Sequence, residues 1–343
     1  MSGRTKQTLY DIVTFILLLC ALAGTFAMAF FAVIRGGKLG EYIALAAFCL
    51  VALAFPVQVW IHELGHLLCG LLSGYRFVSL SVNGIAIDTR GVSFRFGKAY
   101  VGQTQMLPKN GKVSRSGFAF FTIGGALFGL IYGGLFLALY FLVPITPALL
   151  FFELFAPLAI YEALEAVYPC ELPAGRTDGK MLVELKRNSA YAKVFLSVIA
   201  AQGMLADRTY AEIPRELLFK LPVIRADEVA YFALAQLRWQ YLFYNGDEAG
   251  AREQLRRLSG ACEDAEVPEQ VRCDLLYAER VLEGGDCVDQ DACRGDSLAE
   301  LRTRYALTGE GRAEAVNAAE KERYTGIRAV ELKLIERADA LKK

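Results

Sequence analysis

The segment that organises the chain reads Val57-Gln58-Val59-Trp60-Ile61-His62-Glu63-Leu64-Gly65-His66-Leu67-Leu68, inside an otherwise apolar stretch. A helix places residues four apart on one face, so His62 and His66 can direct two imidazole nitrogens to one metal ion. Glu63 follows the first histidine, where a carboxylate can take a proton from a water at that ion. These are the only 2 histidines in the chain. The pattern predicts a zinc site of the hydrolase type.

The composition indicates a membrane protein with a soluble part. Of the 343 residues 55% are hydrophobic, and the mean hydropathy is +0.33. Residues 1–168 hold 11 basic and 7 acidic side chains, whereas the remainder holds 26 and 30. We therefore expect a membrane domain at 1–187 and a soluble domain at 188–343. The 37 basic and 37 acidic residues balance, which gives no support to a nucleic-acid partner.

Four apolar segments are long enough to cross a bilayer as helices, namely Leu9–Ile34, Tyr42–Leu72, Gly117–Val143 and Pro147–Tyr168. Basic residues gather in the loops on one side of these segments, so the positive-inside rule predicts that both termini are cytoplasmic. The expected fold is a mostly α, multi-pass protein in the lipid bilayer, most simply the plasma membrane of a prokaryote.

The stretch between the second and third spans, about residues 75–115, has a different pattern. Phe77–Val82, Ile85–Ile87 and Gly91–Phe96 are short runs of strand-forming residues, and Asn83-Gly84 is typical of a hairpin turn. These runs predict a small β insertion of two or three strands. The alternative is a solvated basic loop.

The fourth span contains acidic residues, which are costly within a membrane. Glu153 is expected near the outer boundary, whereas Glu162 and Glu165 lie deeper and share one helix face. Either they help to build the site, or they are structural groups bonded to their neighbours.

A catalytic zinc ion needs at least one protein ligand beyond the two histidines. Cys170, Glu171 and Asp178 follow the fourth span and are all candidates by their chemistry. Asp178 is the best placed of the three, because it begins a new helix after a segment interrupted by proline.

His62-Glu63-Leu64-Gly65-His66 and Thr177-Asp178-Gly179-Lys180 together resemble the site-2 protease family of intramembrane zinc metalloproteases, as does the glycine-rich Ile123-Gly124-Gly125-Ala126. The resemblance implies that Zn²⁺ is held by His62, His66 and Asp178, that Glu63 is the general base, and that the substrate is a membrane-spanning protein.

The family often has Asn-x-x-Pro before Asp-Gly, with the asparagine holding substrate. This chain has Ala166 at that position, next to Glu165. Glu165 is therefore a candidate substrate-binding residue. Phe77 and Ser79 are candidates too, because an edge strand within Phe77–Phe96 can hold an unwound substrate segment by strand addition.

The C-terminal half is polar with a helical pattern. Ala230–Leu258 indicates two amphipathic helices joined at Asn245-Gly246-Asp247, which resemble a tetratricopeptide-type hairpin, and Leu275–Asp286 with Leu298–Tyr324 is a weaker repeat of it. We expect a soluble domain of helical hairpins. It is either a docking surface for a peptide or protein partner or a packing cap.

Two other functions compete with proteolysis. In the first, the protein is a catalytically inactive membrane adaptor that recruits a partner through its C-terminal helices. The second is a zinc transporter, which is disfavoured because no second metal-relay cluster is visible in the sequence.

Overall fold

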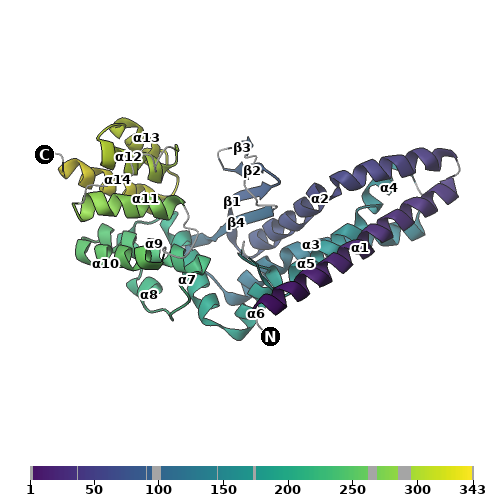
Figure 1. The fold of residues 1–343 in the computed structure, drawn as a ribbon, viewed down its shortest axis with the longest axis horizontal. Coiled ribbons are helices and arrows are strands. Elements are labelled where there is room, and N and C mark those ends of the chain that lie inside the picture. The colour runs from purple at the N-terminus through teal and green to yellow at the C-terminus, as the bar shows by residue number, and fades with distance from the viewer. Residues whose placement is uncertain are drawn as a thin grey trace. The chain divides into compact units, whose positions relative to one another are not determined.

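The computed structural model describes residues 3–36, 38–89, 91–94, 102–144, 146–172, 175–261, 269–284 and 295–341. The chain divides into two compact units, which we call the first unit and the second unit. The first unit comprises Met1–Leu107 and Ser114–Asn188, and the second unit comprises Pro108–Val113 and Ser189–Lys343. Helices dominate both units, and the first contains a small sheet (Figure 1).

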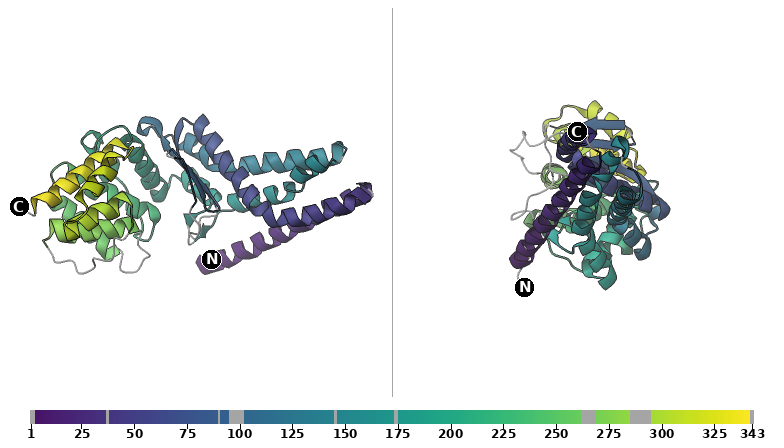
Figure 2. Two further views of the ribbon diagram at one scale, coloured as in Figure 1. Left: turned by 90° about the horizontal axis from the view of Figure 1, so that it is seen from above. Right: turned by 90° about the vertical axis from the view of Figure 1, so that its right-hand side faces the viewer.

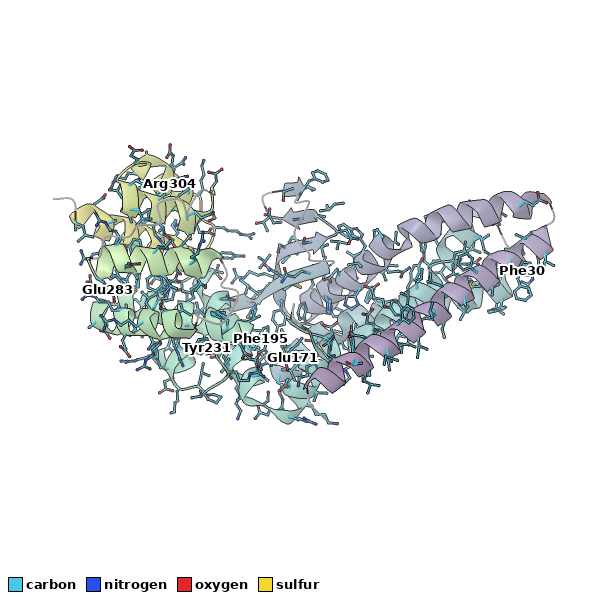
Figure 3. The ribbon with its side chains drawn as sticks, in the orientation of Figure 1. Phe30, Glu171, Phe195, Tyr231, Glu283 and Arg304 are labelled. Carbon is cyan, nitrogen blue, oxygen red and sulfur yellow. The ribbon has the colours of Figure 1, made fainter. Side chains whose placement is uncertain are left out.

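Long helices form the body of the first unit. Helices α1 (Gly3–Gly36), α2 (Lys38–Leu72), α3 (Arg115–Leu142) and α5 (Ala156–Val167) pack against one another (Figure 1). Among the described residues, Gln7–Gly36 and Arg115–Leu142 are long and apolar enough to cross a membrane. Only 28% of the most apolar window of each is buried. Both helices therefore present apolar side chains outward, as the 62% exposed Phe30 does in Figure 3.

The predicted second span forms one helix. Helix α2 has 35 residues and continues through Pro56. The side chains of residues 47–55 lie outside the described part of the chain. The passage of α2 through a membrane therefore stays a prediction.

The predicted fourth span is not one continuous helix. It forms α4 (Pro147–Glu153) and α5, separated at Leu154 and Phe155. The sequence analysis overlooked Pro157, which stands in the first turn of α5. Because proline has no N–H and its ring clashes with the carbonyl four residues earlier, Pro157 favours an interruption here, although α2 continues through Pro56.

Polar side chains bond to the carbonyl groups at this break. Thr25 Oγ1 of α1 donates to the Leu154 carbonyl at 3.3 Å, and Gln58 Nε2 of α2 donates to the Phe155 carbonyl at 3.1 Å. Backbone groups left without helical partners at such an interruption need partners from elsewhere when they are buried. The break is thus an ordered feature of the helix bundle.

The β insertion is a four-stranded sheet in the order β3-β2-β1-β4. Strands β1 (Tyr75–Val82), β2 (Ile85–Asp88) and β3 (Gly91–Phe94) are antiparallel neighbours. The Asn83-Gly84 turn has the positive φ angles, 49° and 85°, of a tight hairpin. The strand prediction is therefore confirmed and the loop alternative is wrong. Arg95 and Phe96, the end of the predicted third strand, lie outside the described residues.

The fourth strand, β4 (Gly102–Pro108), was not expected from the sequence. It forms one edge of the sheet and pairs with β1, so β1 lies in the interior. Exposed Gln103 and Gln105 alternate with the less exposed Thr104 and Met106. This polar alternation gives only a weak strand signal, because few of its residues favour strands.

A short hairpin follows α5 and reverses the chain. Strand β5 (Glu171–Leu172) pairs antiparallel with β6 (Gly175–Arg176), and α6 (Asp178–Arg187) begins directly afterwards. The hairpin thus returns the chain to the end of α5 before α6 starts.

The second unit consists of helices (Figure 2), and most of its buried hydrophobic side chains belong to one large cluster. Its elements are η1 (Lys109–Gly111), α7 (Ala190–Leu205), η2 (Tyr210–Glu212), α8 (Arg215–Phe219), α9 (Val229–Tyr244), α10 (Glu248–Ala261), α11 (Glu269–Tyr277), η3 (Ala278–Leu282), α12 (Leu298–Thr308), α13 (Arg312–Glu320) and α14 (Thr325–Ala340). The predicted hairpin is present as α9 and α10, which turn at Gly246 with φ 88°. The fully buried Trp239 and Ala251 lie in the core.

Candidate metal centre

Three side chains that are far apart in the sequence meet in the first unit. Asp178 Oδ2 lies 3.3 Å from His62 Nε2 and 3.2 Å from His66 Nε2, and the two Nε2 atoms are 3.0 Å apart. Among the described residues, these three form the one group of histidine, cysteine and acidic side chains with a metal-binding arrangement. The structure therefore brings both histidines and Asp178 together at a candidate metal site.

The spacing of the three atoms fits a tetrahedral metal ion. Bonds of about 2.0–2.1 Å in tetrahedral geometry place ligand atoms about 3.3 Å from one another. The observed separations of 3.0, 3.2 and 3.3 Å are close to this value. An ion just outside the plane of the three atoms can bind all of them and keep one position open.

The contact between α2 and α3 explains how His62 is held. A Cβ added to Gly65 would lie 2.3 Å from the Gly124 carbonyl oxygen, and one added to Gly124 would lie 2.5 Å from the Gly65 carbonyl oxygen. A Cβ added to Gly125 would lie 2.5 Å from the His62 ring. The helix backbones thus approach closely because these positions lack side chains.

His66 is oriented by the backbone of α3. Its Nδ1 lies 2.9 Å from the Phe121 carbonyl oxygen, to which only an N–H can bond. This hydrogen bond places a proton on Nδ1, so that Nε2, which faces Asp178, is the nitrogen available to a metal once it carries no proton. In its neutral form, the second histidine of the motif therefore has the tautomer that a metal requires.

Asp178 owes its position to the start of α6. Thr177 is the N-cap: its side chain accepts a bond from Lys180 N and donates to the Tyr168 carbonyl at 2.6 Å. A Cβ at Gly179 would lie only 1.8 Å from the Val167 carbonyl oxygen. Glycine is therefore required where α6 meets the end of α5, and this contact places Asp178 beside the histidines.

Protonated histidines beside Asp178 would favour its ionised form. Burial alone would raise the pKa of Asp178, but His66 and His62 together hold that pKa well below its ordinary value. Asp178 Oδ2 is buried and has no hydrogen-bond donor among the described residues. A buried carboxylate oxygen in this situation is normally paired or bound to a metal.

The other two candidate ligands are engaged elsewhere. The Cys170 thiol lies 3.7 Å from Gln7 Oε1 and 3.7 Å from the Glu171 carbonyl oxygen. The Glu171 carboxylate forms an ion pair with Arg176 at 3.1 Å. The structure thus brings Asp178, and neither Cys170 nor Glu171, to the histidines.

The predicted base, Glu63, is buried and in contact with β4. Thr104 Oγ1 lies 2.6 Å from Glu63 Oε2 and 3.0 Å from the Glu63 carbonyl oxygen, so its hydroxyl can donate to either. A Cβ at Gly102 would lie 2.6 Å from Glu63 Oε1. Sequence reasoning missed both residues. The only signal for them was the polar alternation that marks β4.

The two acidic residues of α5 have different surroundings. Glu165 accepts a hydrogen bond from Tyr10 Oη at 2.8 Å, which joins α5 to α1. Glu162 lies close enough to His62 and Glu63 for electrostatic interaction with both. Of the two, Glu162 is therefore the one beside the metal site, while Glu165 has a structural partner.

The remaining predicted site residues lie on β1. Phe77 packs against the cluster of Val59, Leu80 and Val82, and Ser79 Oγ donates to Gln105 Oε1 at 3.2 Å. Because β1 has neighbours on both sides, its backbone is not free to accept another strand. The edge strands are β3, which lies within the predicted Phe77–Phe96, and β4, which contacts Glu63. Strand addition at a sheet edge stays a prediction.

Comparisons with protein families, with curated proteins and with solved structures found no match to this chain. The function must therefore be inferred from the site itself.

Proposed function

We propose that this protein is an intramembrane zinc metalloprotease of the site-2 protease type, which hydrolyses peptide bonds of membrane-spanning proteins. The observation that carries the proposal is the convergence of His62, His66 and Asp178, with Glu63 next to the first ligand in a helix. This constellation joins two imidazoles, one carboxylate, an open position and a base, which are the parts of a hydrolytic zinc site.

The donor set favours zinc among the common metals. Two nitrogen ligands and one carboxylate at tetrahedral spacing suit Zn²⁺, whereas Ca²⁺ and Mg²⁺ prefer six or more oxygen ligands. When bound, the ion would act as a Lewis acid and lower the pKa of a water ligand to about 7.

Glu63 has the role of general base and then general acid. Its carboxylate takes a proton from the attacking water and returns it to the amine that leaves when the peptide bond breaks. The carboxylate is buried and held by Thr104. That position limits its motion and keeps it available for proton transfer.

The substrate must present an extended segment, because a helical peptide bond is shielded by its own turn. Among the described strands, β4 has a neighbour on one side only, and its Gly102 and Thr104 contact Glu63. Addition of a substrate strand to this edge would bring its peptide bonds toward the base. Of the two edge strands, β3 and β4, we assign substrate binding to β4 because it contacts Glu63, and not to the interior strand β1 with Phe77 and Ser79.

Four membrane crossings are part of the proposal. The candidate spans in α1 and α3 support two of them. α2 supplies the third, and α4 with α5 supplies the fourth as a broken crossing, with Thr25 and Gln58 bonded at the break. Four crossings with basic loops on one side place both termini in the cytoplasm of a prokaryotic cell.

The test is Glu63→Gln, with Glu41→Gln on the same helix as the matched control because Glu41 is exposed. The glutamine variant should keep its zinc and lose cleavage of a co-expressed single-span substrate by about 10²- to 10⁴-fold, while the control cleaves normally. Cleavage by Glu63→Gln at the normal rate would refute the role of the base. A purified protein without metal would instead favour the adaptor function.

A further inference from the structure

Strand β4 meets the proposed base through two residues on one of its faces. Residues two apart in a strand point to the same side, and Gly102 and Thr104 both face Glu63. Thr104 lies within hydrogen-bond distance of the Glu63 carboxylate and of its carbonyl oxygen, at 2.6 and 3.0 Å. Gly102 leaves room for the second carboxylate oxygen, Oε1. The position of β4 therefore determines where the Glu63 side chain can lie.

The segment that ends β4 belongs to the second unit. Pro108 is the last residue of the strand, yet Pro108–Val113 packs with helix α7. A Cβ added to Gly203 of α7 would lie 2.5 Å from the Pro108 carbonyl oxygen. A Cβ added to Gly111 would lie 2.2 Å from Met204 Cγ and 2.7 Å from the Ala200 carbonyl oxygen. We call this tight packing of Pro108–Val113 on α7 the clasp.

The backbone of the clasp has a fixed shape. Asn110 and Gly111 adopt left-handed conformations, with φ of 56° and 68°, and Lys112 N bonds to the Lys109 carbonyl at 3.2 Å. Thr104 is four residues from Pro108, about 13 Å along an extended strand. Leu107 and Pro108 are consecutive residues of β4, so a displacement of the clasp can be passed along the strand backbone to Thr104.

We propose that Thr104 is a positioning residue for Glu63, and that the second unit controls the base by holding the end of β4 in the clasp. This proposal rests on the proposed function for the role of Glu63. Binding of a partner to the helical unit would change activity by moving the clasp. The soluble helices are then a regulatory domain for the site and not only a docking surface.

The first experiment compares Thr104→Val with Thr104→Ser. Valine keeps the shape and removes the hydroxyl, whereas serine keeps the donor. With one zinc per chain retained in both, valine should lower kcat for the single-span substrate by about 10- to 100-fold with a smaller change in KM. Serine should restore most of the rate. Equal kcat for the valine variant and the wild type would overturn the positioning role.

The second experiment perturbs the clasp through Gly203→Ala, with Gly260→Ala as its matched control. Both glycines lie in helices of the second unit, but a Cβ at Gly260 meets nothing within 4 Å. Gly203→Ala should retain zinc and Trp239 fluorescence while lowering kcat at least about fivefold, and it should cause no further loss in a Thr104→Val background. If the losses in kcat of the two single variants multiply in the double variant, the two residues act independently and the proposed coupling through β4 is wrong.

A readout that needs no proteolysis separates this proposal from the proposed function. Hydrogen exchange of the backbone amides of residues 102–107 should be faster in full-length Gly203→Ala than in the wild type and in Gly260→Ala. Unchanged exchange would overturn the clasp even in an active protein. If Gly203→Ala exchanges faster but the wild-type protein cleaves no substrate, the role of the clasp is supported and the protease function is rejected.

Discussion

Two clusters of ionisable side chains, one in each unit, differ in the partners of their carboxylates. In the second unit, the fully buried Arg302 donates to Asp274 at 2.6 Å and to Glu331 at 2.7 Å, and lies 4.9 Å from the centre of the Tyr277 ring. In the first unit, the ion-pair partners of Asp178 are His62 and His66, which are neutral when they act as metal ligands.

The difference separates a structural cluster from a binding site. A buried carboxylate needs a cation or several donors, because its desolvation is costly. For Asp274 and Glu331 that cation is Arg302 of the same chain, so this cluster needs no bound ligand. At Asp178 the partners are two histidines, which can carry a proton or, when neutral, offer nitrogen lone pairs to a metal ion. An acidic cluster thus indicates a binding site for a metal ion when the chain places no lysine or arginine beside its carboxylates.

Removal of Arg302, the cation of the cluster in the second unit, should have the largest effect on stability. Arg302→Met leaves two buried carboxylates without their partner and should lower the free energy of unfolding of the helical unit by about 3–5 kcal/mol. The measurement is urea unfolding of the full-length protein, followed by fluorescence of Trp239 in a Trp60→Phe background.

Arg328→Met is the control for this variant, because Arg328 is an exposed residue of α14. It should change the unfolding free energy by less than about 0.5 kcal/mol. Equal stabilities of Arg302→Met and Arg328→Met would show that the buried cluster does not depend on its cation, and the comparison would fail.

Displacement of one ligand at the first cluster should have an intermediate effect. Gly179→Ala places a Cβ where the Val167 carbonyl lies 1.8 Å away, so α6 must shift and carry Asp178 with it. We expect zinc affinity to fall by at least about tenfold, measured by competition with a chelator at fixed free zinc. Gly134→Ala in α3, with nothing within 4 Å of the new Cβ, should bind normally. Normal zinc affinity of Gly179→Ala would show that the contact between Gly179 and Val167 does not position Asp178.

A partly exposed ion pair should contribute much less to stability than the buried cluster around Arg302. Arg337 donates to Glu248 at 3.0 Å, and this hydrogen bond lowers the pKa of Glu248 despite the opposing effect of burial. The two side chains are 29% and 35% exposed, so solvent screens the pair. Glu248→Gln should therefore lower the free energy of unfolding at pH 7 by only about 0.5–1 kcal/mol.

The pH dependence of that loss has a definite sign. Because the folded pKa of Glu248 is depressed, its contribution is complete above the unfolded value of about 4.3 and disappears as the pH falls through the folded value. Unfolding curves at pH 7 and pH 3 should thus differ for the wild type more than for Glu248→Gln. The exposed pair of Glu253 and Arg257 provides the control through Glu253→Gln. An equal loss at both pH values would contradict this assignment.

Local patterns in the sequence predicted the elements with the strongest signals. The histidine spacing placed His62 and His66 on one helix face, Asn83-Gly84 identified a hairpin, and Asn245-Gly246 identified the turn between α9 and α10. Each of these features depends on residues within a few positions of one another. Local geometry is therefore enough to predict them.

Features that depend on distant contacts could not be predicted. The sequence favoured Asp178 over Cys170 and Glu171, but the close approach of Gly179 to Val167 that holds it beside the histidines is not visible in the spacing. The clasp depends on Gly203, almost a hundred residues after the strand that it holds. The break before α5 was different, because Pro157 was visible in the sequence and was overlooked.

The most direct test of the account is the metal content of the purified protein and of its Asp178→Ala variant, determined by elemental analysis. The account predicts about one zinc per chain in the wild type and a loss of most of it in the variant, while Glu63→Gln keeps its zinc. A wild-type protein without metal, or an Asp178→Ala variant that retains the full amount, would contradict the assignment of the three ligands.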